Sequence, residues 1–368
     1  MIARPVDPAG NFLGRKTDMK EITARLLAWY DRHARKLPWR GSADPYQIWV
    51  SEIMLQQTRT ETVAGYYARF LEAFPTVQDL AAAEESAVLK QWEGLGYYAR
   101  ARNLQAGAKQ VMTEFGGKVP SGVEDLLKIR GIGPYTAGAI ASIAWNLPVP
   151  AVDGNVIRVI SRLYAIGESL GEPGTRTRIE TLAKELVPES RPGDYNQAVM
   201  DLGATVCVPG TPDCDRCPLE DLCRGRRTGA AAELPKIPGA KPPKEMLYDL
   251  ILIYDGKRVL ARKRTEKMLS GLWCFPLMKG WESAEARKAE LRRRWGMEMK
   301  TFRAVGTAKH VFTHQVWQMT LYEGELREPA QAPEGYAWID GEELETLAWP
   351  VAMKMALIPV RRRLSDGQ

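Results

Sequence analysis

No apolar run in the sequence approaches the 18 residues or so that a helix needs to cross a membrane, and residues 1–16 lack the apolar stretch of a signal peptide. The sequence therefore predicts neither a membrane span nor a secretory leader. We expect a cytoplasmic protein, associated with the nucleoid if its source is bacterial. No internal repeat is apparent along the 368 residues.

Cysteine is scarce, with five residues in all, and four of them lie within 17 residues of one another. The four are Cys207, Cys214, Cys217 and Cys223. This clustering favours a metal site over disulfides. One CxxC knuckle with two outlying cysteines fits either zinc or an iron–sulfur cluster with four cysteine ligands, and the spacing does not decide between them. We expect a structural role for this site and a packed, free thiol at Cys274.

The charge balance is slightly positive, with 51 Lys and Arg against 45 Asp and Glu, a net charge of +6. This excess fits a polyanionic partner but does not require one. A chain of 368 residues suggests at least two domains, and 45% hydrophobic residues are ample for two cores.

The stretch 129–155 contains a turn, Gly131-Ile132-Gly133, followed by Pro134 at a helix start. Residues 135–145 are rich in Ala, Gly and Ile, which predicts a closely packed, buried helix. The backbone N–H groups at such a helix N-terminus are able to hold a phosphate. By itself the pattern is a weak signal, and an ordinary αα-turn in a helical domain explains it more readily.

Two carboxyl groups stand in contrasting surroundings. Glu52 lies within the apolar run IWVSEIML, so it is either a boundary residue that reaches solvent or a desolvated acid with a raised pKa. Asp153 precedes a predicted helix, where the N-terminal amides would cap it and keep it ionised. A raised Glu52 and a lowered Asp153 would form the carboxylate pair of a hydrolase acting on glycosidic bonds.

The periodicity divides the chain into four parts: an N-terminal extension (1–17), a helical domain with the cysteine loop 207–223 (18–224), a Pro/Gly/Ala/Lys linker (225–244) and an α+β domain (245–368). Helices are predicted over 19–33, 45–59, 63–74, 77–83, 84–92, 99–115, 120–129, 135–145, 156–165, 175–186 and 195–205. Strands are predicted over 246–254, 258–263, 301–312 and 316–323, with helices over 284–295, 341–346 and 351–362.

Several motifs along residues 26–362 resemble the adenine DNA glycosylases of the MutY family, within the helix-hairpin-helix glycosylase superfamily. They are LPWR (37–40), VSEIMLQQT (50–58), WEGLGYY (92–98), GIGPYTA (131–137), VDGNVIR (152–158) and the cysteine loop. The resemblance implies an all-α helix-hairpin-helix glycosylase domain with a 4Fe-4S cluster loop, followed by an α+β Nudix-like domain. It assigns the four cysteines to that cluster.

The resemblance also implies an activity: removal of adenine mispaired with 8-oxoguanine or guanine in double-stranded DNA, leaving an abasic site. Glu52 would protonate the adenine, and Asp153 would stabilise or trap the oxocarbenium ion with overall retention. Tyr135 and Asn155 would support these two groups, and Arg35, Trp39 and Gln197 would line the pocket of the flipped base. Contacts with DNA and with 8-oxoguanine would come from Gln57, Thr58, Leu95, Tyr97, Gly131, Gly133, Phe312, Thr313 and His314. We expect a monomer.

Tyr135 separates this chain from the related endonuclease III branch, in which a lysine occupies that place and forms a Schiff base. A phenol cannot form an imine, which predicts a glycosylase without strong strand-cleaving activity. The second domain lacks the glutamate cluster of a Nudix box over 280–297, so we do not expect pyrophosphate hydrolysis there. The family's Phe-Ser-His lesion-reading motif appears as Phe312-Thr313-His314, in which Thr keeps the hydroxyl and adds a methyl group.

Three other functions compete with this one. A glycosylase for thymine or uracil mispairs is disfavoured by the motif over 50–58 and by the Nudix-like domain. A DNA-binding iron–sulfur protein without catalysis would not need both Glu52 and Asp153. A nucleotide pyrophosphohydrolase is disfavoured by the missing glutamates.

Overall fold

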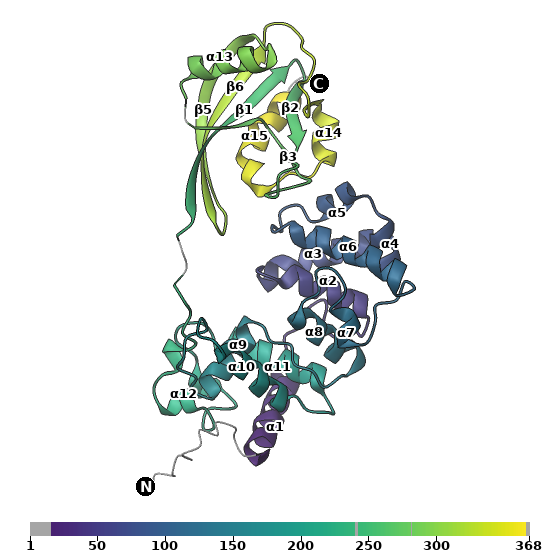
Figure 1. Ribbon diagram of the computed structural model, residues 1–368, viewed down its shortest axis with the longest axis vertical. Coiled ribbons are helices and arrows are strands. Elements are labelled where there is room, and N and C mark those ends of the chain that lie inside the picture. Colours follow the sequence, from purple (N-terminus) through teal and green to yellow (C-terminus); the bar gives the residue numbers. More distant parts are fainter. Residues whose placement is uncertain (1–15, 240–241, 281, 366–368) are drawn as a thin grey trace. The chain divides into compact units, whose positions relative to one another are not determined.

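The computed structural model describes residues 16–239, 242–280 and 282–365 and divides into two compact units (Figure 1). The first unit is Met1–Ala81 with Ala106–Gly239, and the second is Ala82–Gln105 with Ala240–Gln368. Most of the predicted N-terminal extension, residues 1–15, lies outside the described residues. No helix in the described part of the chain is long and apolar enough to span a membrane.

Every element described in residues 16–81 and 106–239 of the first unit is helical, as the sequence predicts. The helices are α1 (Lys16–His33), α2 (Pro45–Leu55), α3 (Thr60–Ala73), α4 (Val77–Ala82), the second part of α6 (Ala99–Glu114), α7 (Val123–Leu126), α8 (Pro134–Trp145), α9 (Gly154–Leu163), α10 (Thr175–Leu186), α11 (Pro192–Thr205) and α12 (Arg224–Arg227), with 3-10 turns η1 (Cys214–Arg216) and η2 (Ala231–Glu233). The helix predicted over 120–129 is only the four residues of α7. It is short because the N–H of Ile129 bonds to the carbonyl of Leu126, which tightens the chain into the next turn.

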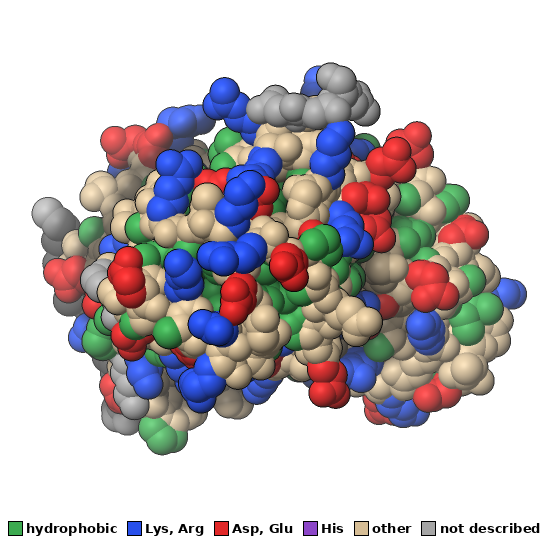
Figure 2. All heavy atoms as spheres, turned by 90° about the horizontal axis from the view of Figure 1, so that it is seen from above, with side chains coloured by type: hydrophobic (Ala, Val, Ile, Leu, Met, Phe, Trp, Pro, Cys, Tyr) green, Lys and Arg blue, Asp and Glu red, His purple; other side chains and the backbone are tan. Residues whose placement is uncertain are grey.

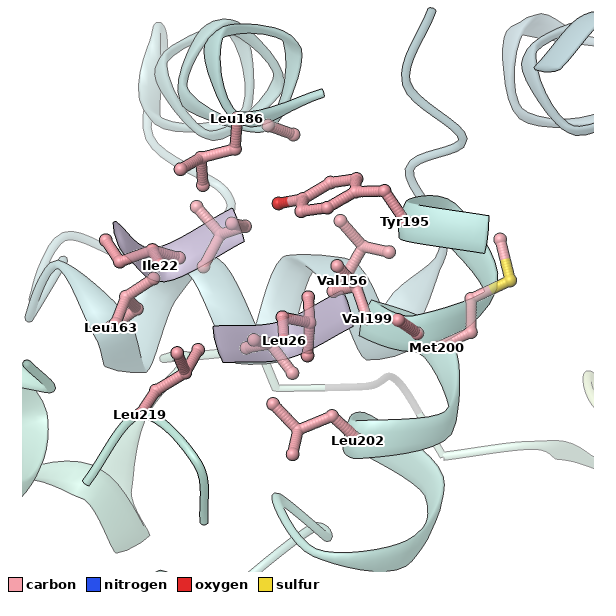
Figure 3. Packing of buried hydrophobic residues seen from close by; sticks show 14 of the residues in the cluster. Ile22, Leu26, Val156, Leu163, Leu186, Tyr195, Val199, Met200, Leu202 and Leu219 are labelled. Carbon is pink, nitrogen blue, oxygen red and sulfur yellow. The ribbon is translucent and has the colours of Figure 1, made fainter. Parts of the chain in front are cut away.

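The core of the first unit lies between α1, α9, α10 and α11. Figure 3 shows Ile22 and Leu26 of α1 beside Val156 and Leu163 of α9. Leu186 closes one side of this cluster and Leu202 another. A buried aliphatic side chain of this kind contributes about 1.5–3 kcal/mol, so these contacts fix where α9 and α11 run.

Helix α8 packs against α2 and against the segment that leads into α9. Gly138 makes this possible, because a Cβ there would lie 2.1 Å from the carbonyl oxygen of Pro150. The close approach brings the start of α9 beside α8, and it thereby positions Asp153.

The second unit is built around a mixed sheet in the order β3-β2-β1-β6-β5, with β4 paired to β1 and β7 paired to β2. The strands are β1 (Lys244–Asp255), β2 (Arg258–Lys263), β3 (Trp273–Cys274), β4 (Leu277–Lys279), β5 (Met299–Val311), β6 (Gln315–Leu326) and β7 (Ala337–Ile339). Strands β1 and β6 run parallel, whereas the other pairs are antiparallel. The four predicted strands are confirmed. The three short ones were missed, since two or three residues carry no measurable alternation.

Helix α13 (Ala284–Trp295) covers one face of this sheet, and α14 (Gly341–Thr346) and α15 (Lys354–Ser365) cover the other (Figure 1). Helix α5 (Glu85–Gln91) and the start of α6 also belong to this unit. The architecture is therefore a helical domain with a second domain of mixed α and β structure.

The segment predicted as a linker is partly structured. Helix α12 and η2 lie within or next to it, and Leu234 is buried. The carbonyl of Leu234 accepts a hydrogen bond of 2.9 Å from Nε of Arg162 on α9. Its first half therefore packs on the helical unit.

Candidate active site

The first unit contains a cavity of about 640 Å³. Its walls come from the turn before α2, from α2 itself, and from the N-terminal ends of α8 and α9 together with α11. It brings together nine of the residues predicted from the sequence: Arg35, Trp39, Glu52, Gln57, Thr58, Tyr135, Asp153, Asn155 and Gln197.

Glu52 is buried in this cavity wall, with 6% of its surface exposed. Its neighbours in sequence, Trp49 and Ile53, belong to the buried face of α2, so the carboxyl group has little access to water. Burial raises the pKa of Glu52, while a hydrogen bond from Tyr135 and the charge of Arg40 act in the opposite direction. Of the two alternatives that the sequence left open for Glu52, burial with an upward shift of its pKa is the one observed.

The phenol of Tyr135 donates a short hydrogen bond to Oε2 of Glu52. Burial and the neighbouring carboxyl groups raise the pKa of Tyr135 well above its ordinary value, so the phenol remains a donor. One oxygen of Glu52 is thus fixed in place. The other oxygen, Oε1, is the one that can carry a proton.

Asp153 is the N-cap of α9 and accepts 2.7 Å and 2.8 Å hydrogen bonds from the N–H of Val156 and the amide of Asn155. These donors lower its pKa, but burial outweighs them and the net shift is upward. The prediction of a lowered pKa was therefore wrong in sign. Helix capping was foreseen from the sequence, whereas the desolvation comes from packing that the sequence does not reveal.

Asn155 is oriented by Arg158 of α9. Nη2 of Arg158 donates 2.7 Å hydrogen bonds to Oδ1 of Asn155 and to the carbonyl of Gly203. Because Oδ1 accepts from Arg158, the amide nitrogen of Asn155 faces Asp153. Nε of Arg158 donates to the carbonyl of Cys207, so the same guanidinium also fixes the start of the cysteine loop.

Beside Arg35, which the sequence had singled out, the predicted base pocket involves two charged residues that it had not, Arg40 and Asp201. Arg35 and Arg40 both line the cavity, and both form ion pairs with Asp201 on α11, at 2.7 Å and 3.0 Å. Asp201 lies four residues after Gln197, which places them on one face of the helix. In the sequence, this spacing from Gln197 was the only sign that Asp201 belongs to the pocket, since its arginine partners are more than 150 residues away.

The hairpin glycines lie at the start of α8. Gly131 has φ of +88°, in the region that favours glycine, and Gly133 is the N-cap of α8 without a side-chain cap. Gln57, at the end of α2, is exposed and also has a positive φ, +59°. A non-glycine residue in that conformation is uncommon and marks a constrained turn.

Leu95, Tyr97 and the motif Phe312-Thr313-His314 all lie in the second unit. The hydroxyl groups of Tyr97 and Thr313 are 3.0 Å apart, within hydrogen-bonding distance. Phe312 packs edge-to-face on Trp317, with ring centroids 4.8 Å apart. Tyr97 is 49% exposed, whereas Leu95 is buried, so in this conformation only the tyrosine is free to enter a base stack.

The four clustered cysteines line one small cavity next to Arg162. Within residues 16–239, 242–280 and 282–365, no three or more His, Cys, Asp or Glu side chains converge to hold a single metal ion. Arg162 is 2% exposed and donates to the carbonyls of Val208 and Gly210, which fixes the first turn of the loop. Cys274 is buried in the core of the second unit.

In the second unit, α13 occupies the place of the expected Nudix box. Its Arg287 is buried against Asp249 of β1, with Nη2 and Nε at 2.5 Å and 2.9 Å from Oδ2 of the aspartate. This buried ion pair fixes α13 against β1.

Comparisons with known proteins match both units. Residues 50–189 match the family model of the HhH-GPD superfamily of base excision DNA repair proteins, and residues 250–358 match that of the NUDIX domain. The adenine DNA glycosylase of Homo sapiens is 37% identical over 406 residues, covering 92% of this chain and 74% of that protein. The adenine DNA glycosylase of Schizosaccharomyces pombe is 32% identical, covering 89% and 87%.

Among solved structures, a thermostable thymine-DNA glycosylase is 28% identical with a TM-score of 0.53, covering 58% of this chain and 98% of that one. Endonuclease III in a non-covalent DNA complex is 22% identical with a TM-score of 0.51, a likeness of fold alone.

Proposed function

Because the chain belongs to the adenine DNA glycosylases, which are DNA N-glycosylases of base excision repair, we propose that it hydrolyses the glycosidic bond of adenine mispaired with 8-oxoguanine in duplex DNA. The observation that carries this proposal is the cavity that holds both Glu52 and Asp153. The bond is unreachable inside a base stack, so the adenine must be flipped into such a cavity, at a cost that is least for a mispair.

Glu52 is proposed as the general acid. Its burial keeps a proton on the carboxyl group at higher pH than usual, and transfer of that proton to adenine N7 improves the leaving group. Tyr135 holds one oxygen of the carboxyl group, which leaves the other to face the base. General acid catalysis of this kind contributes roughly 10²–10⁴-fold.

Asp153 is proposed to stabilise the oxocarbenium ion or to trap it, after which water completes hydrolysis with retention. A growing positive charge on the sugar favours the ionised form of Asp153, which Asn155 and the N–H of Val156 already support by hydrogen bonds. The two carboxyl groups therefore have different roles: Glu52 supplies a proton to the base, and Asp153 supplies a negative charge beside the sugar.

We propose that the reaction stops at the abasic site. Strand cleavage through a Schiff base needs an amine, and no lysine is among the described residues that line the cavity. With the duplex that carries 8-oxoguanine opposite adenine, the expected products are free adenine and a strand that breaks only after alkali. A break without alkali, or a strong borohydride-trapped adduct, would contradict this.

The four cysteines are proposed to hold a 4Fe-4S cluster. In such a cluster each thiolate binds a different iron, so the sulfurs surround the group instead of converging on one ion. This fits four thiols that line one cavity without forming a single-ion site. When bound, the cluster would cross-link the loop and act as a structural brace. Metal analysis should find about four irons per chain; a single zinc would overturn the assignment.

Recognition of the lesion is proposed for the second unit. Phe312, Thr313 and His314 form the turn between β5 and β6, and the exposed ring of Tyr97 lies within hydrogen-bonding distance of that turn. The Thr313 hydroxyl is able to donate and to accept, as reading an oxidised purine edge requires. The ring of Tyr97 would enter the base stack beside the lesion.

A further inference from the structure

Asp201 of α11 is a fully buried carboxylate, with 0% exposure, that does not itself line the cavity. Its two oxygens accept from the backbone N–H of Arg35 at 3.1 Å and from Nε of Arg35 at 2.8 Å. Oδ1 also accepts from Nη2 of Arg40 at 3.0 Å. A buried charge is tolerated only when it is paired in this way, and the two guanidinium groups supply that pairing.

Both guanidinium groups line the cavity, so Asp201 acts on its contents only through them. Each arginine has one further anchor. Nη1 of Arg40 donates 2.7 Å to the hydroxyl of Tyr30 on α1, and Nη1 of Arg35 lies 3.4 Å from Oγ1 of Thr60 on α3. These are neutral partners. Asp201 is therefore the counter-charge among the contacts that fix the two arginines.

The position of Arg40 matters because of Glu52. The groups that act on the Glu52 carboxyl are Tyr135 of α8, Arg40 before α2 and Asp153 at the start of α9. Of these, Arg40 is the cation, and its charge lowers the pKa of Glu52. A free cation at that place would favour an ionised Glu52, which has no proton to give.

We propose that Asp201 is a positioning residue that holds Arg35 and Arg40 in the cavity wall, where its carboxylate offsets part of the positive charge of the two guanidinium groups. The inference rests on the proposed function, since it gives Asp201 a part in keeping the general acid protonated. Without Asp201, Arg35 and Arg40 would offer hydrogen bonds to a base in the cavity, but with their full positive charge near the acid. Tethered to Asp201, they do so with a smaller penalty to the acid.

The test is the pH dependence of single-turnover adenine release from the 8-oxoguanine:adenine duplex. Asp201→Asn keeps the shape and removes the charge, so the pKa of Glu52 should fall and the descending limb of the profile should move to lower pH. At pH values above the pKa of the general acid, each pH unit by which that pKa falls lowers the rate about tenfold. The loss of rate should therefore be several-fold larger at pH values above the descending limb than at pH values below it. A loss of equal size at all pH values would indicate a merely structural role and overturn the proposal.

Asp194→Asn is the matched control, because Asp194 lies on the same helix and pairs with Arg191 near the surface. Its profile should equal that of the wild type. Arg40→Gln tests the other partner of the ion pair, because removing this cation should move the descending limb of the pH profile to higher pH. In the double variant Arg40→Gln with Asp201→Asn, the limb should not move to lower pH. An unmoved limb in Arg40→Gln would overturn the proposal even if Asp201→Asn failed to fold.

Asp201→Glu separates charge from position. It keeps the charge but displaces the two guanidinium groups by about one methylene, so the rate should fall while the limb stays in place. A limb that moves as far as in Asp201→Asn would contradict the role of Asp201 in offsetting that positive charge. The wild-type profile distinguishes the two proposals: without adenine release the proposed function fails, whereas release with an unresponsive limb defeats only this inference.

Discussion

Burial of Glu52 lowers the stability of the folded protein and favours the protonated carboxyl group that the proposed reaction needs. Its carboxyl group is buried among apolar neighbours of α2 and accepts a hydrogen bond from the phenol of Tyr135, with the charge of Arg40 acting on it. Such surroundings favour the protonated form, and an ionised carboxylate there is poorly compensated. The same residue is therefore proposed as the acid of the reaction and carries a cost to the folded state.

The cost predicts that Glu52→Gln is more stable than the wild type at neutral pH. In the unfolded chain the group titrates near 4.5, while in the folded protein its pKa is higher. Between these values the folded state binds more protons, so the wild type loses stability as pH rises through that window. Glutamine does not titrate. Thermal unfolding should give Glu52→Gln a higher midpoint at pH 7.5 and a smaller advantage near pH 4.5. An advantage independent of pH would contradict this account.

Sequence and structure agree unevenly at the residue scale. Burial of Glu52 follows from the run IWVSEIML, and capping by Asp153 follows from its place before a helix. The sign of the Asp153 pKa shift does not follow, because desolvation depends on elements that meet only in the folded chain. Asp201 was missed for the same reason: its partners, Arg35 and Arg40, are 166 and 161 positions away.

At the scale of elements, the site depends on how closely α9 and α11 approach each other. Gly203 of α11 faces Asn155 of α9, and a Cβ at Gly203 would lie 2.6 Å from the Cβ of Asn155. Asn155 in turn donates to Asp153. The packing of two helices therefore sets the orientation of a side chain in the cavity.

Gly203→Ala should displace Asn155, and with it the amide that holds Asp153. Overpacking of this kind costs about 1–3 kcal/mol of stability, and excision should also slow. Gly167→Ala is the matched control, since a Cβ there meets nothing within 4 Å. Chemical denaturation and excision rates of both variants check this. Wild-type stability and rate in Gly203→Ala would show that the contact is not constraining.

Elements were predictable where their apolar period extends over several turns. The long helices α1, α2, α9 and α10 and the strands β1, β2, β5 and β6 follow the sequence closely. The short α7 and the strands β3, β4 and β7 do not, since their ends are decided by tertiary hydrogen bonds and pairing. Propensity over two to four residues carries too little free energy to decide.

At the scale of the whole molecule, the division into units does not follow the predicted linker alone. Residues 82–105, inside the predicted helical domain, belong to the second unit and place Tyr97 beside Thr313, 216 positions along the chain. On the face that Figure 2 shows, the charge excess of +6 is not gathered into a patch of one sign. In Figure 2, Lys and Arg side chains lie in a loose group with Asp and Glu among them.

Contact between Tyr97 and Thr313 predicts a role for the threonine hydroxyl in discriminating the lesion. Thr313→Ala should lose about fivefold to tenfold of the preference for adenine opposite 8-oxoguanine over adenine opposite guanine, the value of roughly one hydrogen bond. Thr313→Ser keeps the hydroxyl and should retain the preference. Paired excision rates on the two duplexes decide it. An unchanged ratio in the alanine variant would assign discrimination elsewhere.

The central claim, that a buried Glu52 protonates a flipped adenine, is tested most directly by single-turnover adenine release. The duplex carries 8-oxoguanine opposite adenine, with a matched thymine:adenine duplex and the Glu52→Gln protein as controls. We predict fast release that requires both the lesion and Glu52, while Glu52→Gln still binds the mispair. Equal release by Glu52→Gln, or no release by a DNA-binding protein loaded with its cluster, would contradict the account.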